Sequence, residues 1–303
     1  MVNITHKQHS LRKAVATAIV NVSLPATIAA IIDKTVPKGD VFEFARAAGL
    51  LAIKKTSDVI PDCHPLPVEY AAITYEMNDM QVQIRVEVQT IYKTGVEVEA
   101  MHGAAITALT MYDMLKPIDK NVEISTIRLI SKEGGKTDYA GNQNKQLRIA
   151  VIVCSDSISA GKTQDLSGKL IKEKISNFEL DVENFEIIPD DIEQIQSKLK
   201  QLARDEFDLV LLTGGTGLSA RDVTPEALKP LIEREVPGIS ELMRSYGQQR
   251  MPYAMLSRSV SGFINKSLVI AMPGSPKAAE ETMDALFPHV LHVFKVALGE
   301  RHE

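Results

Sequence analysis

A glycine-rich loop and an aspartate that follows it are the residues whose types and spacing most clearly predict chemistry. The apolar run 209–212 predicts a buried strand, and the segment Thr213-Gly214-Gly215-Thr216-Gly217 follows it directly. Glycines let the main chain approach a ligand and point N–H groups at an anion, while threonine hydroxyls add donors. Asp222 lies between this loop and a helix that Thr224, as N-cap, and Pro225 are expected to start. The pattern predicts a phosphate-binding loop beside a carboxylate that could hold Mg²⁺.

The glycine loop matches neither of the common nucleotide-binding motifs. No Gly-Lys-Ser/Thr follows it, as in a Walker A loop, and its glycines lack the spacing of a dinucleotide fold. Considered alone, the glycines are as compatible with a tight structural turn as with a ligand loop. The neighbouring Asp222, Thr224 and Pro225 favour the ligand loop.

Strands and helices are predicted to alternate around this loop in the second half of the chain. Apolar runs at 147–154, 185–188, 208–212 and 267–272 predict strands, and the segments 166–175 and 192–202 predict helices. This alternation is typical of an α/β doubly wound, mostly parallel sheet, in which ligands bind at the carboxyl ends of the strands. Further candidates at such ends are Ser155, Asp156, Asp190 and Ser275. The alternative for Asp190 and Asp191 is a helix N-cap.

The first half predicts a different architecture. Strands are expected at 12–23, at 121–131 and in a hairpin over 68–92, with helices at 25–34, 40–55 and 96–116. Asp40 is the predicted N-cap of the second of these helices, with Glu43 three places on as in a capping box. This order favours an α+β ferredoxin-like sheet. Asp113 and Lys116 share one face of the last helix, an arrangement that a surface salt bridge would also explain. The apolar stripe expected for that helix comprises Ala104, Ala105, Ala108, Leu109, Tyr112 and Leu115.

Three prolines in the segment 60–67 hold Cys63 and His64 on a stiff backbone. The two side chains could form a metal pair, although no further Cys or His cluster lies nearby. Alternatively, Cys63 is buried beside a hydrogen-bonded His64, or His64 is a polar group at the edge of a site. Lys38 is also open to two interpretations, because a loop lysine before a helix can be a solvated charge or a ligand for an anion.

Length and composition narrow the class of protein. At 303 residues, with 45% hydrophobic and 24% charged residues, the chain is long enough for two domains. A net charge of −5, with no excess of Lys and Arg in either half, argues against a nucleic-acid binder. The two cysteines are far apart, so no disulfide framework or structural zinc site is indicated. No signal core or apolar run of membrane length is present, so we expect a soluble, cytoplasmic protein without a membrane contact.

The polar segment 137–146 has no periodic apolar pattern and predicts a domain boundary. We therefore expect one domain at 1–138, a linker at 139–147 and a second domain at 148–303.

Five dispersed motifs of the first half carry a family resemblance. They are Lys38-Gly39-Asp40-Val41-Phe42, Cys63-His64-Pro65-Leu66, Lys93-Thr94-Gly95-Val96-Glu97 with Glu99-Ala100, Tyr112-Asp113-Met114 and Gly134-Gly135-Lys136. Over residues 1–138 the chain resembles the cyclic pyranopterin monophosphate synthases of molybdenum cofactor synthesis. The resemblance implies that a cyclised dihydro derivative of GTP is rearranged to a pyranopterin with a cyclic phosphate, with loss of pyrophosphate. It also implies a homo-oligomer, a hexamer with active sites between subunits.

The same resemblance implies roles for individual residues. Asp113 and Lys116 match the family's acid and base, and a lysine near a carboxylate can act as an acid once substrate excludes water. Substrate binding is implied for Arg12, Lys38, Lys54, His64, Glu97, Glu99 and Lys136.

A second set of motifs covers nearly all of 148–299. The motifs are Ser155-Asp156, Asp165-Leu166-Ser167-Gly168, Pro189-Asp190, Thr213 to Gly217, Arg221-Asp222-Val223-Thr224-Pro225-Glu226 and Pro273-Gly274-Ser275. They are similar to those of the MogA-type molybdopterin adenylyltransferases. The resemblance implies attack of the molybdopterin phosphate on the α-phosphate of ATP. It also implies that Asp190 and Asp222 are the catalytic residues and that they hold Mg²⁺. It implies a trimer for related proteins.

Together the two resemblances predict a bifunctional enzyme with pterin and nucleotide substrates. ATP is expected as a co-substrate with Mg²⁺, and no tightly bound organic cofactor is expected. Substrate binding in the second half is assigned to Ser155, Asp156, Thr213, Gly214, Gly215, Thr216, Gly217 and Ser275. The alternative keeps the first half as an enzyme and makes the second a non-catalytic molybdopterin-binding scaffold.

Overall fold

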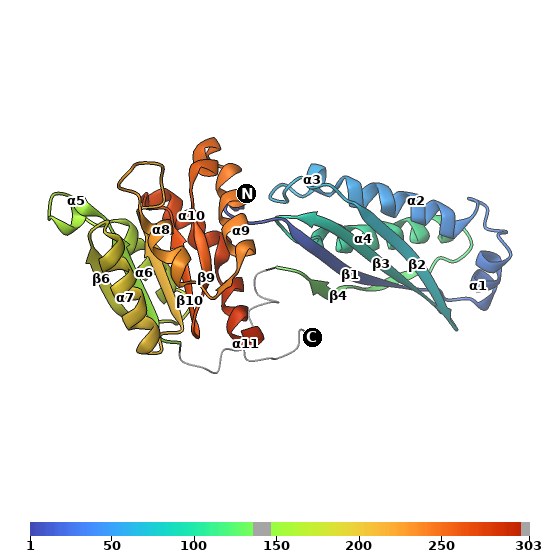
Figure 1. Ribbon diagram of the computed structural model, residues 1–303. Coiled ribbons are helices and arrows are strands. Elements are labelled where there is room, and N and C mark those ends of the chain that lie inside the picture. The colour runs from blue at the N-terminus through green and yellow to red at the C-terminus, as the bar shows by residue number, and fades with distance from the viewer. Residues whose placement is uncertain (136–146, 298–303) are drawn as a thin grey trace. The chain divides into compact units, whose positions relative to one another are not determined.

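The computed structural model describes residues 1–135 and 147–297 (Figure 1). The chain divides into two compact units, 1–139 and 140–303, each considered by itself below. Lys136 and the greater part of the expected linker, 139–146, lie outside the described residues. Within the described ranges, no helix is long and apolar enough to cross a membrane.

The first unit is an antiparallel sheet with its long helices packed on one face. Strands β1 (Ser10–Asn21), β2 (Tyr70–Asn78), β3 (Gln81–Tyr92) and β4 (Glu123–Glu133) are arranged in the order β2-β3-β1-β4. The helices are α1 (Pro25–Ile32), α2 (Val41–Lys54), α3 (Thr56–Val59) and α4 (Glu97–Leu115). Chain order and strand order are those of a split βαβ arrangement. The predicted hairpin is confirmed, since Asn78 pairs with Gln81 across the turn between β2 and β3.

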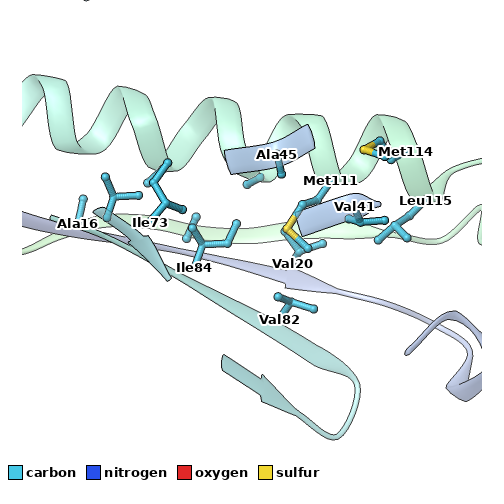
Figure 2. Close-up of a cluster of buried hydrophobic side chains, with 14 of the residues drawn as sticks. Ala16, Val20, Val41, Ala45, Ile73, Val82, Ile84, Met111, Met114 and Leu115 are labelled. Atoms are coloured by element: carbon cyan, nitrogen blue, oxygen red, sulfur yellow. The ribbon is translucent and has the colours of Figure 1, made fainter. Parts of the chain in front are cut away.

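Alternation along the central strands builds the core of this unit. Ala16 and Val20 on β1 and Val82 and Ile84 on β3 point toward α2 and α4 (Figure 2). The predicted N-cap is confirmed, because the Asp40 carboxylate accepts from the backbone N–H groups of Phe42 and Glu43 at the start of α2.

The predicted apolar stripe of α4 is wrong at two positions. Leu109 and Tyr112 are 53% and 36% exposed, whereas Met111 and Met114 are buried. Small residues form much of the buried face, because α2 and α4 cross so closely that a Cβ on Gly49 would lie 2.1 Å from Thr107 Oγ1. Small residues carry little hydrophobic signal, so the face of the helix could not be read from apolar spacing alone.

The second unit is a mixed, mostly parallel sheet covered on both faces. Its strand order is β6-β5-β7-β10-β9-β8, with parallel pairing from β6 to β10 and antiparallel pairing of β9 and β8. The strands are β5 (Ile149–Cys154), β6 (Val182–Ile188), β7 (Leu209–Thr213), β8 (Arg234–Glu235), β9 (Val260–Ile264) and β10 (Ser267–Met272). The helices are α5 (Asp156–Ser159), α6 (Ser167–Ser176), α7 (Ile192–Arg204), α8 (Thr224–Leu228), α9 (Pro237–Gln248), α10 (Pro276–Leu286) and α11 (Val293–Ala297), with 3₁₀ turns η1 (Lys229–Leu231), η2 (Pro252–Leu256) and η3 (His289–His292).

Successive residues of the central strands point to opposite faces of the sheet and pack in two separate hydrophobic cores. Leu211 of β7 packs in the cluster that contains residues of α6, α9 and α10, while Leu212 packs in the cluster that contains residues of α7 and α8. Because strands buried on both faces need apolar residues at every position, β5 and β7 are continuous apolar runs. The predicted classes, antiparallel α+β and mostly parallel α/β, agree with the two sheets.

Candidate functional site

The C-terminal end of α4 carries a cluster of two lysines around one carboxylate. Asp113 accepts from Lys116 Nζ at 2.7 Å and from Lys38 Nζ at 2.6 Å, each through a different oxygen. Lys38 comes from the loop before α2, so the fold adds a third charge to the pair that sequence spacing predicted. The hydrogen bonds from Lys116 and Lys38 lower the pKa of Asp113 to about 2, and Asp113 in turn raises the pKa of Lys116. This exposed cluster can bind an anion and move a proton.

The N-terminal end of α4 carries an acidic cluster of different character. Glu99 is 3% exposed and accepts from the Cys63 thiol, with Sγ 3.3 Å from Oε1. Glu97 is paired with Lys132 of β4 at 3.2 Å. Burial raises the pKa of Glu99, and burial together with the Glu99 contact raises the pKa of Cys63 to about 11.

His64 and Arg12 are both held by main-chain carbonyls. His64 Nε2 donates to the Val2 carbonyl at 2.8 Å, which leaves Nδ1 as the acceptor in the neutral ring. Arg12 Nε donates to the Tyr92 carbonyl at 3.3 Å. Within 1–135 and 147–297 there is no group of three or more His, Cys, Asp or Glu that could hold a metal, so a metal pair at Cys63 and His64 gains no support.

The two clusters of the first unit lie at opposite ends of one helix. Glu99 and Asp113 are separated by a rise of about 21 Å along α4. Lys54, exposed in the last turn of α2, belongs to the Glu99 end, since Thr56, two residues further on, bonds His102 of α4 at 3.1 Å. The structure therefore separates the predicted acid and base from most of the predicted substrate ligands within one chain. Lys136, also predicted to bind substrate, lies outside the described residues.

In the second unit, three strand ends converge on the glycine loop. Gly214 has φ +106°, and a Cβ there would lie 2.1 Å from the Cys154 carbonyl oxygen at the end of β5. A Cβ on Gly274, after β10, would lie 2.8 Å from Gly214 Cα. Thr213 Oγ1 donates to the Pro273 carbonyl at 2.9 Å, which ties the ends of β7 and β10 together. Only glycine allows the backbones this close, so the loop has a packing role whether or not it binds a ligand.

Asp156 and Asp190 form a second, polar connection across this edge. Each carboxylate accepts from the other residue's backbone N–H, at 3.0 and 3.1 Å. Arg221 donates to Asp156 Oδ2 from Nε at 2.9 Å and from Nη2 at 2.6 Å, and it lowers the pKa of Asp156. Burial raises the pKa of Asp190, and its Oδ1 is buried without a hydrogen-bond partner. The N-cap alternative applies to Asp191, which caps α7, and not to Asp190.

Asp222 is fixed beside the glycine loop by a tight turn. Its Oδ2 accepts from the Ser219 N–H at 2.8 Å, and a Cβ on Gly217 would lie 2.9 Å from the same oxygen. The predicted N-cap role of Thr224 is wrong, because Val223 is the N-cap of α8 and the Thr224 hydroxyl donates to the Gly214 carbonyl at 2.9 Å. The Thr224 hydroxyl therefore satisfies the hydrogen-bonding capacity of the buried Gly214 carbonyl, as buried polar groups generally require.

Arg258 organises the loop from a distant segment and was missed in the sequence. Its Nε donates to the Gly217 carbonyl at 2.7 Å and its Nη2 to the Asp222 carbonyl at 2.5 Å, while Glu226 pairs with Nη1. Its own backbone N–H donates to the Thr216 carbonyl at 2.9 Å. No local motif marks this arginine, since all of its partners are at least 30 residues away in the chain.

The remaining predicted residues lie at helix starts on the same edge of the sheet. Ser155 caps α5 by accepting from the Ile158 N–H, and Ser275 caps α10 by accepting from the Ala278 N–H. Thr216 is buried, with its hydroxyl 3.5 Å from that of Ser257. A pocket of about 210 Å³ opens beside Ser275 and Ser257, with Met243, Arg244 and Tyr253 also in its wall.

The carboxylates of this edge suit a magnesium ion. Asp190 and Asp222 are close enough to influence each other electrostatically, and Asp190 Oδ1 is free of other partners. Mg²⁺ prefers carboxylate oxygens and is commonly held by one or two of them together with water and substrate phosphates. These residues therefore fit the ion that the sequence predicted.

Comparisons with known proteins place both units in one pathway. The chain joins an antiparallel α+β unit to a mostly parallel α/β unit with a glycine loop at its strand ends. Residues 1–135 match the MoaC family, and residues 150–292 match the family described as "Probable molybdopterin binding domain". The "Molybdenum cofactor biosynthesis bifunctional protein" of Chlorobaculum tepidum is 37% identical over 302 residues, covering 100% of this chain and 96% of that protein. The chain therefore belongs to the family of bifunctional molybdenum cofactor biosynthesis proteins.

Each unit is also similar, over most of their length, to relatives that match that unit alone. A cyclic pyranopterin monophosphate synthase of Pelobacter propionicus is 49% identical over 139 residues, which are 45% of this chain and 86% of that protein. A molybdopterin adenylyltransferase of Helicobacter pylori is 41% identical over 157 residues, which are 50% of this chain and 89% of that protein.

Proposed function

We propose that this chain is a bifunctional enzyme. Its first unit converts the cyclised dihydro-GTP intermediate to cyclic pyranopterin monophosphate with release of pyrophosphate. Its second unit adenylylates molybdopterin with Mg-ATP. Similarity to separate enzymes over each unit supports both activities, and the residue clusters described above supply groups with the required chemistry.

The Lys38–Asp113–Lys116 cluster is the observation that carries the first activity. A triphosphate needs cations, and ring rearrangement needs a group that accepts a proton and another that returns it. Asp113 is ionised at neutral pH, since its pKa lies near 2 while Lys116 and Lys38 donate to it. It becomes a stronger base when those hydrogen bonds are released. Lys38 and Lys116 hold this carboxylate in the free protein. Substrate phosphate can replace Asp113 as their partner, after which Lys116 is available as the acid.

The acidic cluster recognises the opposite end of the same substrate in this proposal. Glu97 and Glu99 accept from the N–H groups of the purine-derived ring, and Arg12, Lys54, His64 and Lys136 bind ribose and phosphate. A rise of about 21 Å along α4 exceeds the reach of one small substrate across a single chain. We therefore propose that each site combines the lysine cluster of one subunit with the acidic cluster of another, in a homo-oligomer, most simply a hexamer.

Pyrophosphate release from the cyclised GTP derivative tests the first activity. The Lys116→Ala variant should lose that release while keeping its fold and oligomeric state. Release at the rate of the unaltered protein would remove Lys116 from the mechanism.

The second activity rests on the convergence of Asp190, Asp222 and the glycine loop at one sheet edge. Backbone N–H groups of 215–217, with the Ser155 and Ser275 hydroxyls, bind the ATP phosphates. The Thr213 hydroxyl and the Gly214 N–H, also predicted to bind substrate, instead donate to the Pro273 and Met272 carbonyls and hold the loop in place. Asp190 and Asp222 hold Mg²⁺, which neutralises charge on the phosphates when bound. Asp156 holds Arg221 at the rim, where the guanidinium can pair with the departing pyrophosphate. Positioning and charge neutralisation supply the catalysis, because phosphoryl-type transfer needs little covalent participation from the protein.

Formation of adenylylated molybdopterin from molybdopterin and Mg-ATP tests this activity. Product that depends on Asp222 establishes the transferase. Tight binding of molybdopterin without product would favour the non-catalytic scaffold instead.

A further inference from the structure

The thiol of Cys63 lies within the acidic cluster of the first unit and has no role in the functions proposed above. We propose that Cys63 is a positioning residue, whose S–H group orients the Glu99 carboxylate and keeps it an acceptor for the substrate ring. The proposal rests on the assignment of Glu99 to substrate recognition.

The contact between the two residues is direct and buried on the Glu99 side. Cys63 Sγ is 3.3 Å from Glu99 Oε1, and Glu99 is 3% exposed. A carboxylate with so little contact with water needs donors from the protein, because burial without a hydrogen bond is costly. The thiol is a side-chain donor that reaches Glu99 from outside α4.

The backbone around Cys63 fixes the position of this donor. Pro61, Pro65 and Pro67 restrict the segment, and the Cys63 N–H donates to the Ile60 carbonyl at 3.0 Å in a turn. The Pro67 carbonyl accepts from Thr90 Oγ1 of β3 at 2.5 Å, which anchors the far end of the segment to the sheet. Cys63 is therefore presented to Glu99 by a stiff loop that is tied to the sheet.

The protonation state of Cys63 suits a donor and not a nucleophile. Burial and the neighbouring Glu99 raise the pKa of the thiol to about 11, so it carries its proton at neutral pH. A thiol with this environment reacts slowly, because the thiolate is the reactive form. Of the two acceptors near the S–H group, the Glu99 carboxylate at 3.3 Å is closer than the His64 carbonyl oxygen at 3.9 Å.

The pKa of Glu99 is subject to opposing effects. The hydrogen bond from Cys63, which lies in a neighbouring segment, favours the ionised form. Burial and Glu97 raise the pKa of Glu99, while hydrogen bonds from its own backbone N–H and from the thiol lower it. The other charges facing this group are Lys132 of β4, which pairs with Glu97, and Asp62, which acts on the thiol. A donor to a carboxylate stabilises the charged form, so loss of the thiol should make Glu99 harder to ionise.

The test is the pH dependence of kcat/KM for pyrophosphate release by the full chain. Cys63→Ala should move the acidic limb of the profile to higher pH by about 0.5 unit, as expected for loss of a weak hydrogen bond to a charged group. Cys63→Ser restores a donor and should return the limb toward its original position. Cys154→Ala changes the chain's other cysteine, which is buried in the second unit, and should leave the synthase profile unaltered.

Three outcomes separate this inference from the proposed function. An unmoved limb in Cys63→Ala, or a Cys63→Ser variant that is shifted as far as Cys63→Ala, overturns the positioning role. If Glu99→Gln retains full synthase activity, the assignment of Glu99 itself is wrong. If Glu99→Gln is inactive and Cys63→Ala keeps the original pH profile, the inference fails and the proposed function stands.

Discussion

The two units place their candidate residues in opposite ways. In the second unit, the ends of β5, β6, β7 and β10 bring Asp156, Asp190 and the glycine loop into contact within one chain. In the first unit, α4 holds Asp113 at one end and Glu99 at the other. Parallel strands deliver all their carboxyl ends to one edge, and we propose that the site of the second unit is therefore complete within one chain. A single long helix on an antiparallel sheet keeps its two ends apart, and we propose that the site of the first unit therefore requires a second copy.

Loss of the acid in the first unit should have the largest effect. Lys116→Ala is expected to lower pyrophosphate release by about 10²- to 10⁴-fold, the range for loss of a general acid. Glu99→Gln should also be inactive, since it removes the charged acceptor at the other end of α4.

Mixed oligomers of these two inactive variants give the sharpest test of the comparison. Random assembly from equal amounts would leave about a quarter of the sites with both clusters intact, if each site draws on two subunits. Activity that reappears on co-expression supports the shared site. Mixed oligomers that stay inactive would place the whole site within one chain and remove the contrast between the units.

Loss of a carboxylate in the second unit should affect that unit alone. Asp222→Ala is expected to lower adenylyl transfer by about 10²- to 10³-fold, the size of effect for one preorganised electrostatic group. Pyrophosphate release from the GTP-derived substrate should be unchanged in the same preparation. Mixing Asp222→Ala with Asp190→Ala subunits should give no recovery, because both residues serve one site in one chain; recovery would contradict the monomeric site.

The glycine loop should be intolerant of a side chain. Gly214→Ala introduces a Cβ against the Cys154 carbonyl oxygen at a positive φ, and is expected to destabilise the second unit by about 2–4 kcal/mol. Gly238→Ala is the matched control, since nothing lies within 4 Å of its Cβ position. The protection of β5 and β7 peptides against hydrogen exchange reports the stability of the second unit in both variants. Equal protection in the two would show that the close approach is not needed.

The smallest expected effect concerns stability at the buried end of α4. Burial raises the folded-state pKa of Glu99 above its usual 4.5. The contribution of Glu99 to the stability of the first unit is therefore greatest at low pH and falls as the pH rises through the folded-state pKa. Glu99→Gln removes this loss and should raise the melting temperature of the first unit at pH 7 but not below pH 4.5. Glu97→Gln, which breaks the pair with Lys132, should give no such gain. A pH-independent difference would argue against the titration of Glu99.

Several features were predictable because they depend on local patterns. Strands β5 and β7 were found because they are almost entirely apolar runs, and the Asp40 cap because side-chain capping is a local contact. The two-residue strand β8 and the strand β9, in which Ser261 and Gly262 interrupt the apolar pattern, were not predicted. The stripe of α4 was misread because glycine and alanine, which allow α2 to approach, carry little hydrophobic signal. Arg258 was missed because its contacts with the loop cross more than 30 residues of chain.

The sequence by itself determined the two classes of unit, the family and the residue types needed for each reaction, since these are written in motifs and periodic patterns. Tertiary structure alone decided which residues that are far apart in the sequence come into contact. It brought Lys38 to Asp113, Cys63 to Glu99 and Arg221 to Asp156. The reason is geometric, because a strand or helix sets the spacing of neighbours along the chain, but only packing against other elements sets the distance between residues far apart in sequence.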